Sequence, residues 1–257
     1  DLLVFLTGTV DVESRTGDIG MSDGAAATTA GGNIRYQAGG SVRVGGLNAG
    51  SGVIVIEALG DVLDNGDIDT DLVAAETRII AGNAIGSQAD SLDTNVQVIA
   101  GRSGNGGIHL ANDGDLIVGV VAGAVVQRVG GDGGIRNHAD PVDGSLADLV
   151  TGATGNVVLE SLAGFLTTVN SRIVTNQLTA EAPGRIGLDT TINQIVALTT
   201  ADSSITIREL NDLVSVDINA GPNDVVLTAG GNVTDGDAAL DVQGRTFTAV
   251  VNGNIGA

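Results

Sequence analysis

The sequence predicts an all-β fold, a right-handed parallel β-helix in which coils of about 20 residues stack into a β-solenoid. Three observations lead to this prediction: a composition unlike that of a compact domain, a repeat of short strand-like phrases, and glycine-rich turns between the phrases. The right hand of the coil is expected because strand twist and crossover connections in parallel sheets share one chirality.

The apolar content comes almost wholly from small and branched residues. Hydrophobic residues make up 42% of the 257 residues and aromatic residues 2%, whereas a compact domain of this size fills a thick core with several aromatic rings. Val, Ile, Leu and Ala instead suit a thin core of stacked layers. The 40 glycines lack the three-residue period of collagen, and the aliphatic content is too high for a disordered chain.

The clearest repeat joins the phrase Gly32–Val44 to the phrase Gly52–Asp64. A shift of 20 residues (52 − 32) aligns the two, with Ile34 on Ile54, and apolar residues alternate with polar ones in both copies. Such short strands cannot bury a face alone, so equivalent strands must stack about 4.8 Å apart. The chain would then make about 11–12 coils and form a rod about 50–60 Å long.

A longer phrase, Leu92–Val121, matches Leu188–Ile218 at a shift of 96 to 97 residues, which predicts a higher-order unit of several coils. The phrase of the first repeat also returns twice. Residues 1–257 are therefore interpreted as one solenoid segment of a longer repeat protein, with repeat units near 52–121, 155–220 and 223–257.

The least regular stretch is Val125–Val150. It contains the cluster GGDGG at Gly130–Gly134, together with His138 and Pro141, and it interrupts the match between the repeats. We interpret it as a loop on the flank of the solenoid, where solenoids place variable contacts, with a short helix at Gly144–Val150 as the alternative.

Several phrases resemble the repeats of filamentous-haemagglutinin-like β-helix proteins and other giant bacterial surface proteins. They are GDIGM and the residues after it, AGGNIRYQAGGSV, AGNAIGS followed by LDTNV, and GGIHL followed by GDLIVG. The resemblance covers nearly the whole chain, and it implies secretion, an extracellular or cell-surface place, and a role in adhesion, aggregation or matrix building.

Charge limits the partners. The formal net charge of −20 repels nucleic acid and anionic lipid, and no apolar run reaches the length of a membrane helix, so neither nucleic acid nor membrane insertion is expected. We expect contacts with flanking coils of the same protein or with end-to-end copies, because an open solenoid end exposes strand edges. Glycans and host or neighbouring cell surfaces are the further expected partners.

Catalytic residues are scarce. The absence of Cys and Lys removes thiol nucleophiles and Schiff bases, and of the two histidines His109 should point outward from a strand and His138 lies in the irregular stretch beside Asp140 and Asp143. We therefore expect no enzyme. The alternative is a polysaccharide-binding or polysaccharide-cleaving β-helix, which would place two carboxylates on one outer face.

One acidic cluster has the spacing of a cation-binding loop. Asp67, Asp69 and Asp71 occupy alternate positions and Asp64 precedes them, and carboxylate oxygens in loops suit Ca²⁺. The competing interpretation is a solvated turn, and apart from this Ca²⁺ no cofactor is expected. Altogether the sequence predicts a structural or adhesive solenoid that acts as a rigid spacer or fibre, with a self-assembling extracellular filament as a second alternative.

Overall fold

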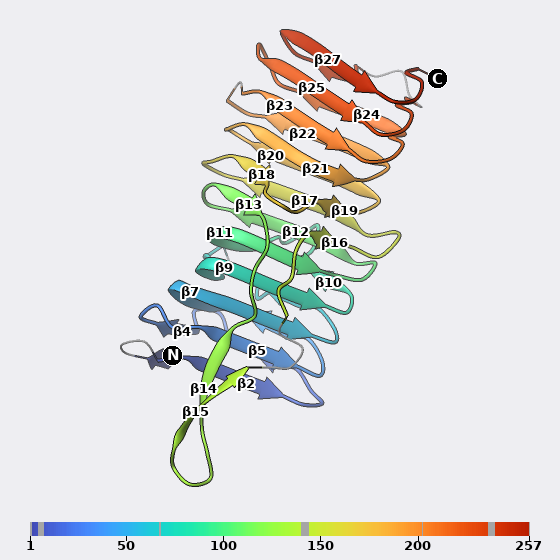
Figure 1. Ribbon diagram of the computed structural model, residues 1–257. Coiled ribbons are helices and arrows are strands. Elements are labelled where there is room, and N and C mark those ends of the chain that lie inside the picture. Colours follow the sequence, from blue (N-terminus) through green and yellow to red (C-terminus); the bar gives the residue numbers. More distant parts are fainter. Residues whose placement is uncertain are drawn as a thin grey trace.

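The computed structural model is a β-solenoid whose coils stack along one axis from the N-terminal to the C-terminal end (Figure 1). About 11 coils follow one another roughly 22 residues apart, slightly more than the spacing of the first repeat. The front strands run from left to right while the chain rises, so the coil is right-handed, as predicted (Figure 1). The structure describes residues 2–4, 8–66, 68–139, 144–201, 203–235 and 240–256.

The strands form three parallel sheets, which we name from the view of Figure 1. The front sheet contains β2 (Val10–Ser14), β5 (Ile34–Ala38), the later parts of β7 (Gly46–Ala58), β9 (Leu72–Ala81) and β11 (Leu92–Arg102), then β13 (Leu116–Val118), β16 (Leu149–Val150), β18 (Leu166–Thr168), β19 (Ile173–Val174), β21 (Ile186–Thr191), β23 (Ile205–Glu209), β25 (Asp224–Ala229) and β27 (Thr246–Val251). The back sheet contains β3 (Ile19–Gly20), β6 (Val42–Val44), β8 (Val62–Asp64), β10 (Ala84–Ile85), β12 (Gly107–Asn112), β17 (Asn156–Ser161), β20 (Gln177–Ala182), β22 (Gln194–Thr199), β24 (Ser215–Asn219) and β26 (Val242–Gln243). The third sheet contains β1 (Leu2–Val4), β4 (Ala26–Thr29) and the first parts of β7, β9 and β11.

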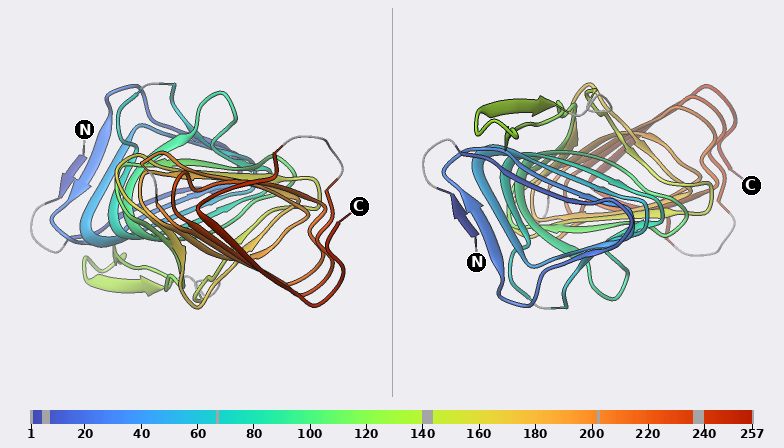
Figure 2. Two further views of the ribbon diagram at one scale, coloured as in Figure 1. Left: turned by 90° about the horizontal axis from the view of Figure 1, so that it is seen from above. Right: turned by 90° about the horizontal axis from the view of Figure 1, so that it is seen from below.

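The cross-section changes along the rod from three sheets to two. In β12, Ile108 pairs with Ile85 of the back sheet, whereas Leu110 pairs with Leu92 of the third sheet, so one strand closes both sheets. Each later coil has one strand in the back sheet and one in the front sheet, except that the front part of the coil after β17 is divided into β18 and β19, and the end views show this flattening (Figure 2). The core therefore becomes a thin double layer, which small aliphatic side chains can fill.

The register confirms the first repeat. Ile34 pairs with Ile54 and Val42 with Val62, as the shift of 20 residues predicts. All four side chains are buried and belong to one continuous apolar core that runs through the stack. Apolar ladders inside and polar positions outside thus follow directly from the alternation in the sequence.

The two phrases of the longer match, Leu92–Val121 and Leu188–Ile218, do not occupy the same sheet of the solenoid. What they share is the hydrogen bonding at the turn between two strands. Thr94 lies in the third sheet and Thr190 in the front sheet. Yet both hydroxyl groups bond to a buried polar side chain one coil later, Asn112 at 2.9 Å from Thr94 and Glu209 at 2.6 Å from Thr190. The repeated phrase therefore specifies a polar corner that the solenoid uses on more than one side.

Glu209 tests this corner. Its two carboxylate oxygens accept four hydrogen bonds, from the Thr190 hydroxyl and from the backbone N–H groups of Ile192, Leu210 and Asn211. Glu209→Gln would turn an amide donor toward N–H donors, and we expect it to lower the free energy of unfolding by about 1–3 kcal/mol in urea denaturation. The exposed Glu160→Gln should change little; equal losses in the two variants would contradict this role.

Candidate functional site

The irregular stretch of the sequence leaves the solenoid in the middle of a front strand. Below this point β11 is continuous, but β13 pairs with its Val98–Ile99 part and β16 with its Gly101–Arg102 part. Residues 119–139 and 144–148, which we call the strap, depart between the two. The strap runs back along the front sheet and contains the antiparallel hairpin of β14 (Val125–Val129) and β15 (Ile135–Ala139) (Figure 1).

The strap covers an outer face that would otherwise meet water. Val121 and Leu146 pair with each other and pack with Ala100 of β11 in a small second cluster of buried apolar residues. Further along, Val126 of β14 is fully buried. The strap thus buries apolar outward positions of the front sheet together with Arg78, whose guanidinium donates to the Gly144 carbonyl oxygen of the strap at 2.9 Å, and these contacts hold the strap to the coils.

An ion network joins the strap to the first coil. Asp11 on β2 accepts hydrogen bonds from Arg35 of the next coil, at 3.0 and 3.3 Å, and from Arg128 of β14. Arg128 also donates to Glu13 at 2.9 Å. Burial by itself would raise the pKa of Asp11, but the two guanidinium groups outweigh it and hold the pKa below the usual 3.8. The network therefore ties residues that lie 115 and 117 positions apart in the sequence.

The stretch Val125–Val150, interpreted from the sequence as a flanking loop, lies against the front sheet in its described part and is docked rather than free. Gly130–Gly134 forms the hairpin turn, as a turn cluster should, and Leu146 and β16 are extended, so the short helix expected as the alternative does not form. His138 lies on β15 opposite Val126, while Asp140 and Asp143 lie outside the described residues.

We expect Asp11→Asn to destabilise the N-terminal coils by about 3–5 kcal/mol, because it removes the carboxylate that neutralises the buried Arg35 guanidinium. The stability that Asp11 contributes is present above pH 3.8 and is lost as the pH falls through its lower folded pKa. Urea denaturation of the two proteins from pH 2 to pH 7 checks both points. The exposed pair of Asp224 and Arg245 gives the control, because Asp224→Asn should change the midpoint little; comparable losses would refute the network.

The structure separates the four aspartates of the predicted calcium loop. Asp64 at the end of β8 and Asp71 before β9 are both buried, Asp69 is exposed, and Asp67 lies outside the described residues. Two of the four are therefore brought together inside the solenoid, at a corner between the back and third sheets.

Asp64 and Asp71 form a buried carboxyl pair. One Asp71 oxygen accepts the backbone N–H of Asp93 at 2.9 Å, and one Asp64 oxygen accepts that of Asn65. The second oxygen of each, Asp71 Oδ1 and Asp64 Oδ2, is buried without a fixed donor. Burial and the neighbouring charge of Asp64 raise the pKa of Asp71 to about 9, so the pair holds one proton at neutral pH.

This pair alone is too small a donor set for calcium. Ca²⁺ takes six to eight oxygen ligands, and nowhere in the described ranges do three or more acidic or imidazole side chains gather around a space for a metal ion. Calcium binding therefore stays a prediction, and it depends on Asp67. What the described geometry supports directly is a shared proton.

Replacing Asp71 by Asn should stabilise the protein. The wild-type fold holds a proton that the unfolded chain loses above about pH 4, so its free energy of unfolding falls as the pH rises from about 4 to about 9. The amide that Asp71→Asn introduces would be a permanent donor to Asp64, and we expect a gain of about 2–4 kcal/mol at pH 7.

Urea denaturation across this pH range is the measurement, with the exposed Asp113→Asn as control. A flatter pH profile for Asp71→Asn alone supports the shared proton. A loss of stability at pH 7 together with loss of a calcium-dependent rise in Tm would instead favour calcium.

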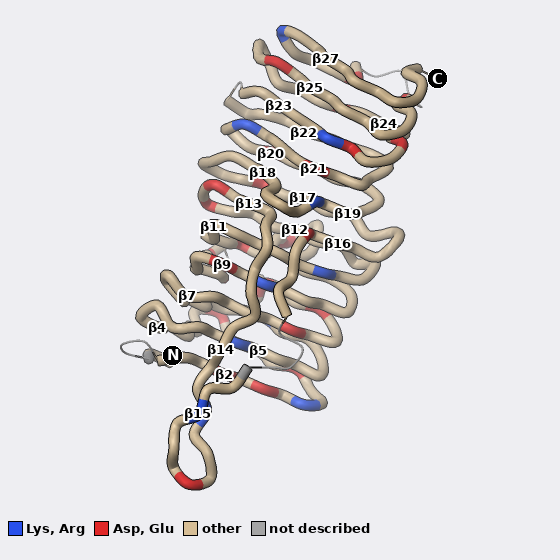
Figure 3. Tube along the Cα trace, in the orientation of Figure 1, with Lys and Arg blue, Asp and Glu red and all other residues tan. Residues whose placement is uncertain are grey.

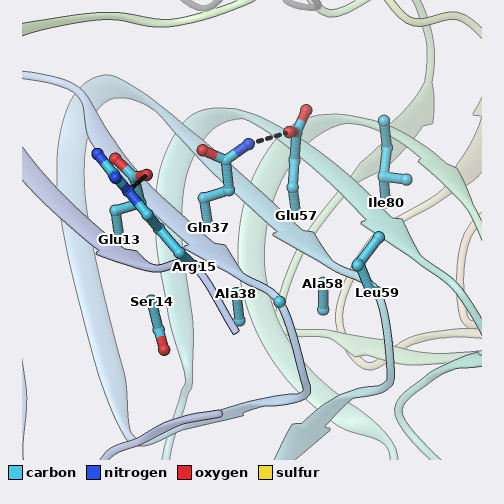
Figure 4. Close-up of a pocket in the computed structure, with 10 residues that line it drawn as sticks. Glu13, Ser14, Arg15, Gln37, Ala38, Glu57, Ala58, Leu59 and Ile80 are labelled. Carbon is cyan, nitrogen blue, oxygen red and sulfur yellow. Dashed lines mark hydrogen bonds and ion pairs between the residues drawn. The ribbon is translucent and has the colours of Figure 1, made fainter. Parts of the chain in front are cut away.

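A shallow groove on the front sheet carries the pair of carboxylates that a polysaccharide-cleaving enzyme would need. Glu13, Gln37 and Glu57 stand side by side on successive coils, and Gln37 donates to Glu57 at 3.3 Å (Figure 4). Arg128 and Arg15 hold the pKa of Glu13 below 4.5. Glu57 in turn accepts a hydrogen bond from an arginine of the next coil. A glycosidase needs one carboxyl with a raised pKa as its acid, and the lowered pKa of Glu13 does not suit that role.

A second concavity escaped the sequence reasoning. His109 points outward from β12, as predicted, but it is buried where it lines a hollow in the outer face of the back sheet. The residues that line the hollow with His109 come from four segments, 61–63, 83–88, 105–106 and 154–156, which only the stacking of the coils brings together.

Comparisons with known proteins return no relatives. No protein-family model matches the chain, and neither a curated protein nor a solved structure matches it significantly. In the part of the chain that the structure describes, no helix has the length and apolar character needed to cross a membrane. The fold is thus established by its own geometry, as a β-solenoid.

Proposed function

We propose that this chain is a structural and adhesive β-solenoid segment of a large secreted or cell-surface bacterial protein, where it acts as a rigid spacer or fibre. The observation that carries the proposal is the continuity of the backbone pairing: 25 strands from Leu2 to Val251 belong to one sheet system without a break. Such a ladder has no hinge between coils. The surplus of acidic residues spread over the stack keeps it soluble, and the resemblance to bacterial surface repeats supports the place (Figure 3).

The tip of the strap is the surface best suited to contact another molecule through apolar groups. Val129 is 74% exposed and Ile135 69% exposed, and they pair with each other across the hairpin. Figure 1 shows the tip projecting beyond the first coil, away from the sheets. Exposed apolar side chains on a protruding hairpin favour an adhesive contact.

The proposal predicts a rod with an axial length of about 50 Å and retention on cells or extracellular matrix. Small-angle scattering measures the first and beads coated with the chain measure the second. The double substitution Val129→Ser and Ile135→Ser should reduce retention at least roughly tenfold without changing the scattering curve. Leu210→Ser with Val214→Ser, two other exposed apolar residues, is the matched control.

Retention that neither variant changes would remove the strap tip from the adhesive role. No retention on any surface would leave the spacer as the function. A polysaccharide screen completes the test, because release of reducing ends or unsaturated products would overturn the non-enzymatic proposal.

A further inference from the structure

One row of outward positions on the front sheet is buried over five successive coils, those of β2, β5, β7, β9 and β11. Each member pairs with the next, and the row is Asp11, Arg35, Val55, Arg78 and Ala100. The last four are at most 2% exposed, whereas the outward side chain of Arg208 on β23, beyond the strap, is 63% exposed. The strap runs along the front sheet over these coils and accounts for the burial (Figure 1).

The far end of the strap bonds to the first of these coils. Arg128 of β14 donates to two carboxylates of β2, those of Asp11 and Glu13. The N–H of Gln127 donates to the Thr9 hydroxyl at 2.7 Å. The bonded residues lie 115 to 118 positions apart in the sequence. The strap, which departs from the sixth coil, therefore links that coil directly to the first.

The strap also contacts the coils between. The side-chain amide of Asn33, on the second coil, donates to the Val125 carbonyl oxygen at 3.0 Å, and its oxygen accepts the N–H of Val53 on the third. On the fourth coil the Arg78 guanidinium donates to the Gly144 carbonyl oxygen at 2.9 Å. The fifth coil contributes to the small apolar cluster described above. The strap is thus in contact with every one of the five coils that it crosses.

Such contacts change how a solenoid opens. In a plain solenoid each coil contacts only its neighbours, so coils can fray one at a time from an end. The strands from β20 to β27 pair in this way, each with the coil before and the coil after. Below the strap, by contrast, opening the first coil requires breaking its bonds with the strap. Freeing the strap in turn exposes apolar positions that it covers on the third to fifth coils.

We propose that the strap is a clamp that makes the first five coils open as one cooperative unit, whereas the coils from β20 to β27 fray one by one. The device goes beyond the proposed function, because it concerns how the rod resists opening and not what the rod contacts. In a cooperative unit a loss of stability at one place lowers the protection of the whole unit. The clamp therefore predicts that a change at the fifth coil is felt at the first.

Hydrogen exchange of the backbone amides, followed strand by strand in the native protein, measures these openings. In the wild type the slowest amides of β2, β5, β7, β9 and β11 should share one protection factor. Those of β21, β23, β25 and β27 should lose protection step by step toward β27.

Two variants loosen opposite ends of the strap. Arg128→Gln removes the bonds to the first coil and leaves Asp11 paired with Arg35, and Leu146→Ala opens the apolar cluster on the fifth coil. Each should speed exchange at least roughly tenfold in β2 and in β11 alike. Leu188→Ala, at a fully buried position of β21, is the matched control; it should speed exchange near β21 and leave β2 unchanged.

Effects confined to β2 in Arg128→Gln and to β11 in Leu146→Ala would overturn the clamp, because the strap would then only pack locally. Protection in the wild type that falls step by step from β11 to β2 would overturn it as well. If either variant fails to fold, the wild-type profile decides alone: one common protection factor supports the clamp and a graded one refutes it.

Discussion

The parallel backbone ladder between successive coils is the constraint on which the rest of the structure depends. Each coil must repeat the path of the one below it, so a strand can end only where its neighbours end, and turns must stack on turns. Where the chain turns between two strands, side chains bond to the next coil: Thr94 to Asn112 and Thr190 to Glu209. Polar corners of this kind satisfy backbone groups that would otherwise be buried without partners. They let the cross-section change from three sheets to two without breaking the ladder.

The same constraint explains where the strap leaves the solenoid and where its buried ion network forms. An insertion can leave a solenoid only by opening a strand or a corner, and the strap does so between β13 and β16. Once outside, the segment must bury its apolar residues on a neighbouring face, which it does with Val121 and Leu146. The buried charge of Arg35 is neutralised by Asp11 on the adjacent coil, and the same carboxylate holds Arg128 of the strap. The position of the strap thus depends on contacts between segments far apart in the sequence, such as Arg128 with Asp11, and not on the pairing of successive coils.

The fold could be predicted from the sequence because each strand pairs with the strand about 20 residues away, so the repeat in the sequence is the pairing in the structure. The alternation in Gly32–Val44 and its copy gave the strands, their register and the coil length. It could not predict the docking of the strap, since nothing in Val125–Val150 indicates that Arg128 would meet Asp11, 117 residues away. The approach of Asp71 to Asp64 was half predicted: both were recognised as one acidic cluster, but their burial depends on the corner that β8 and β9 form. The hollow beside His109 was missed because its lining comes from four segments that only the stacking of the coils brings together.

The distribution of these features over the faces of the rod has a consequence for stability. The strap occupies the outer face of the front sheet over the first half of the molecule, so that face is used for stability (Figure 2). The back sheet is left open there, and on it the chain keeps a neutral histidine and an amide oxygen unpaired. Evolution toward stability alone would replace His109 by an aliphatic residue, because this would remove the cost of an unsatisfied buried nitrogen. The unpaired atoms are therefore a cost in stability that the ladder of the neighbouring coils offsets.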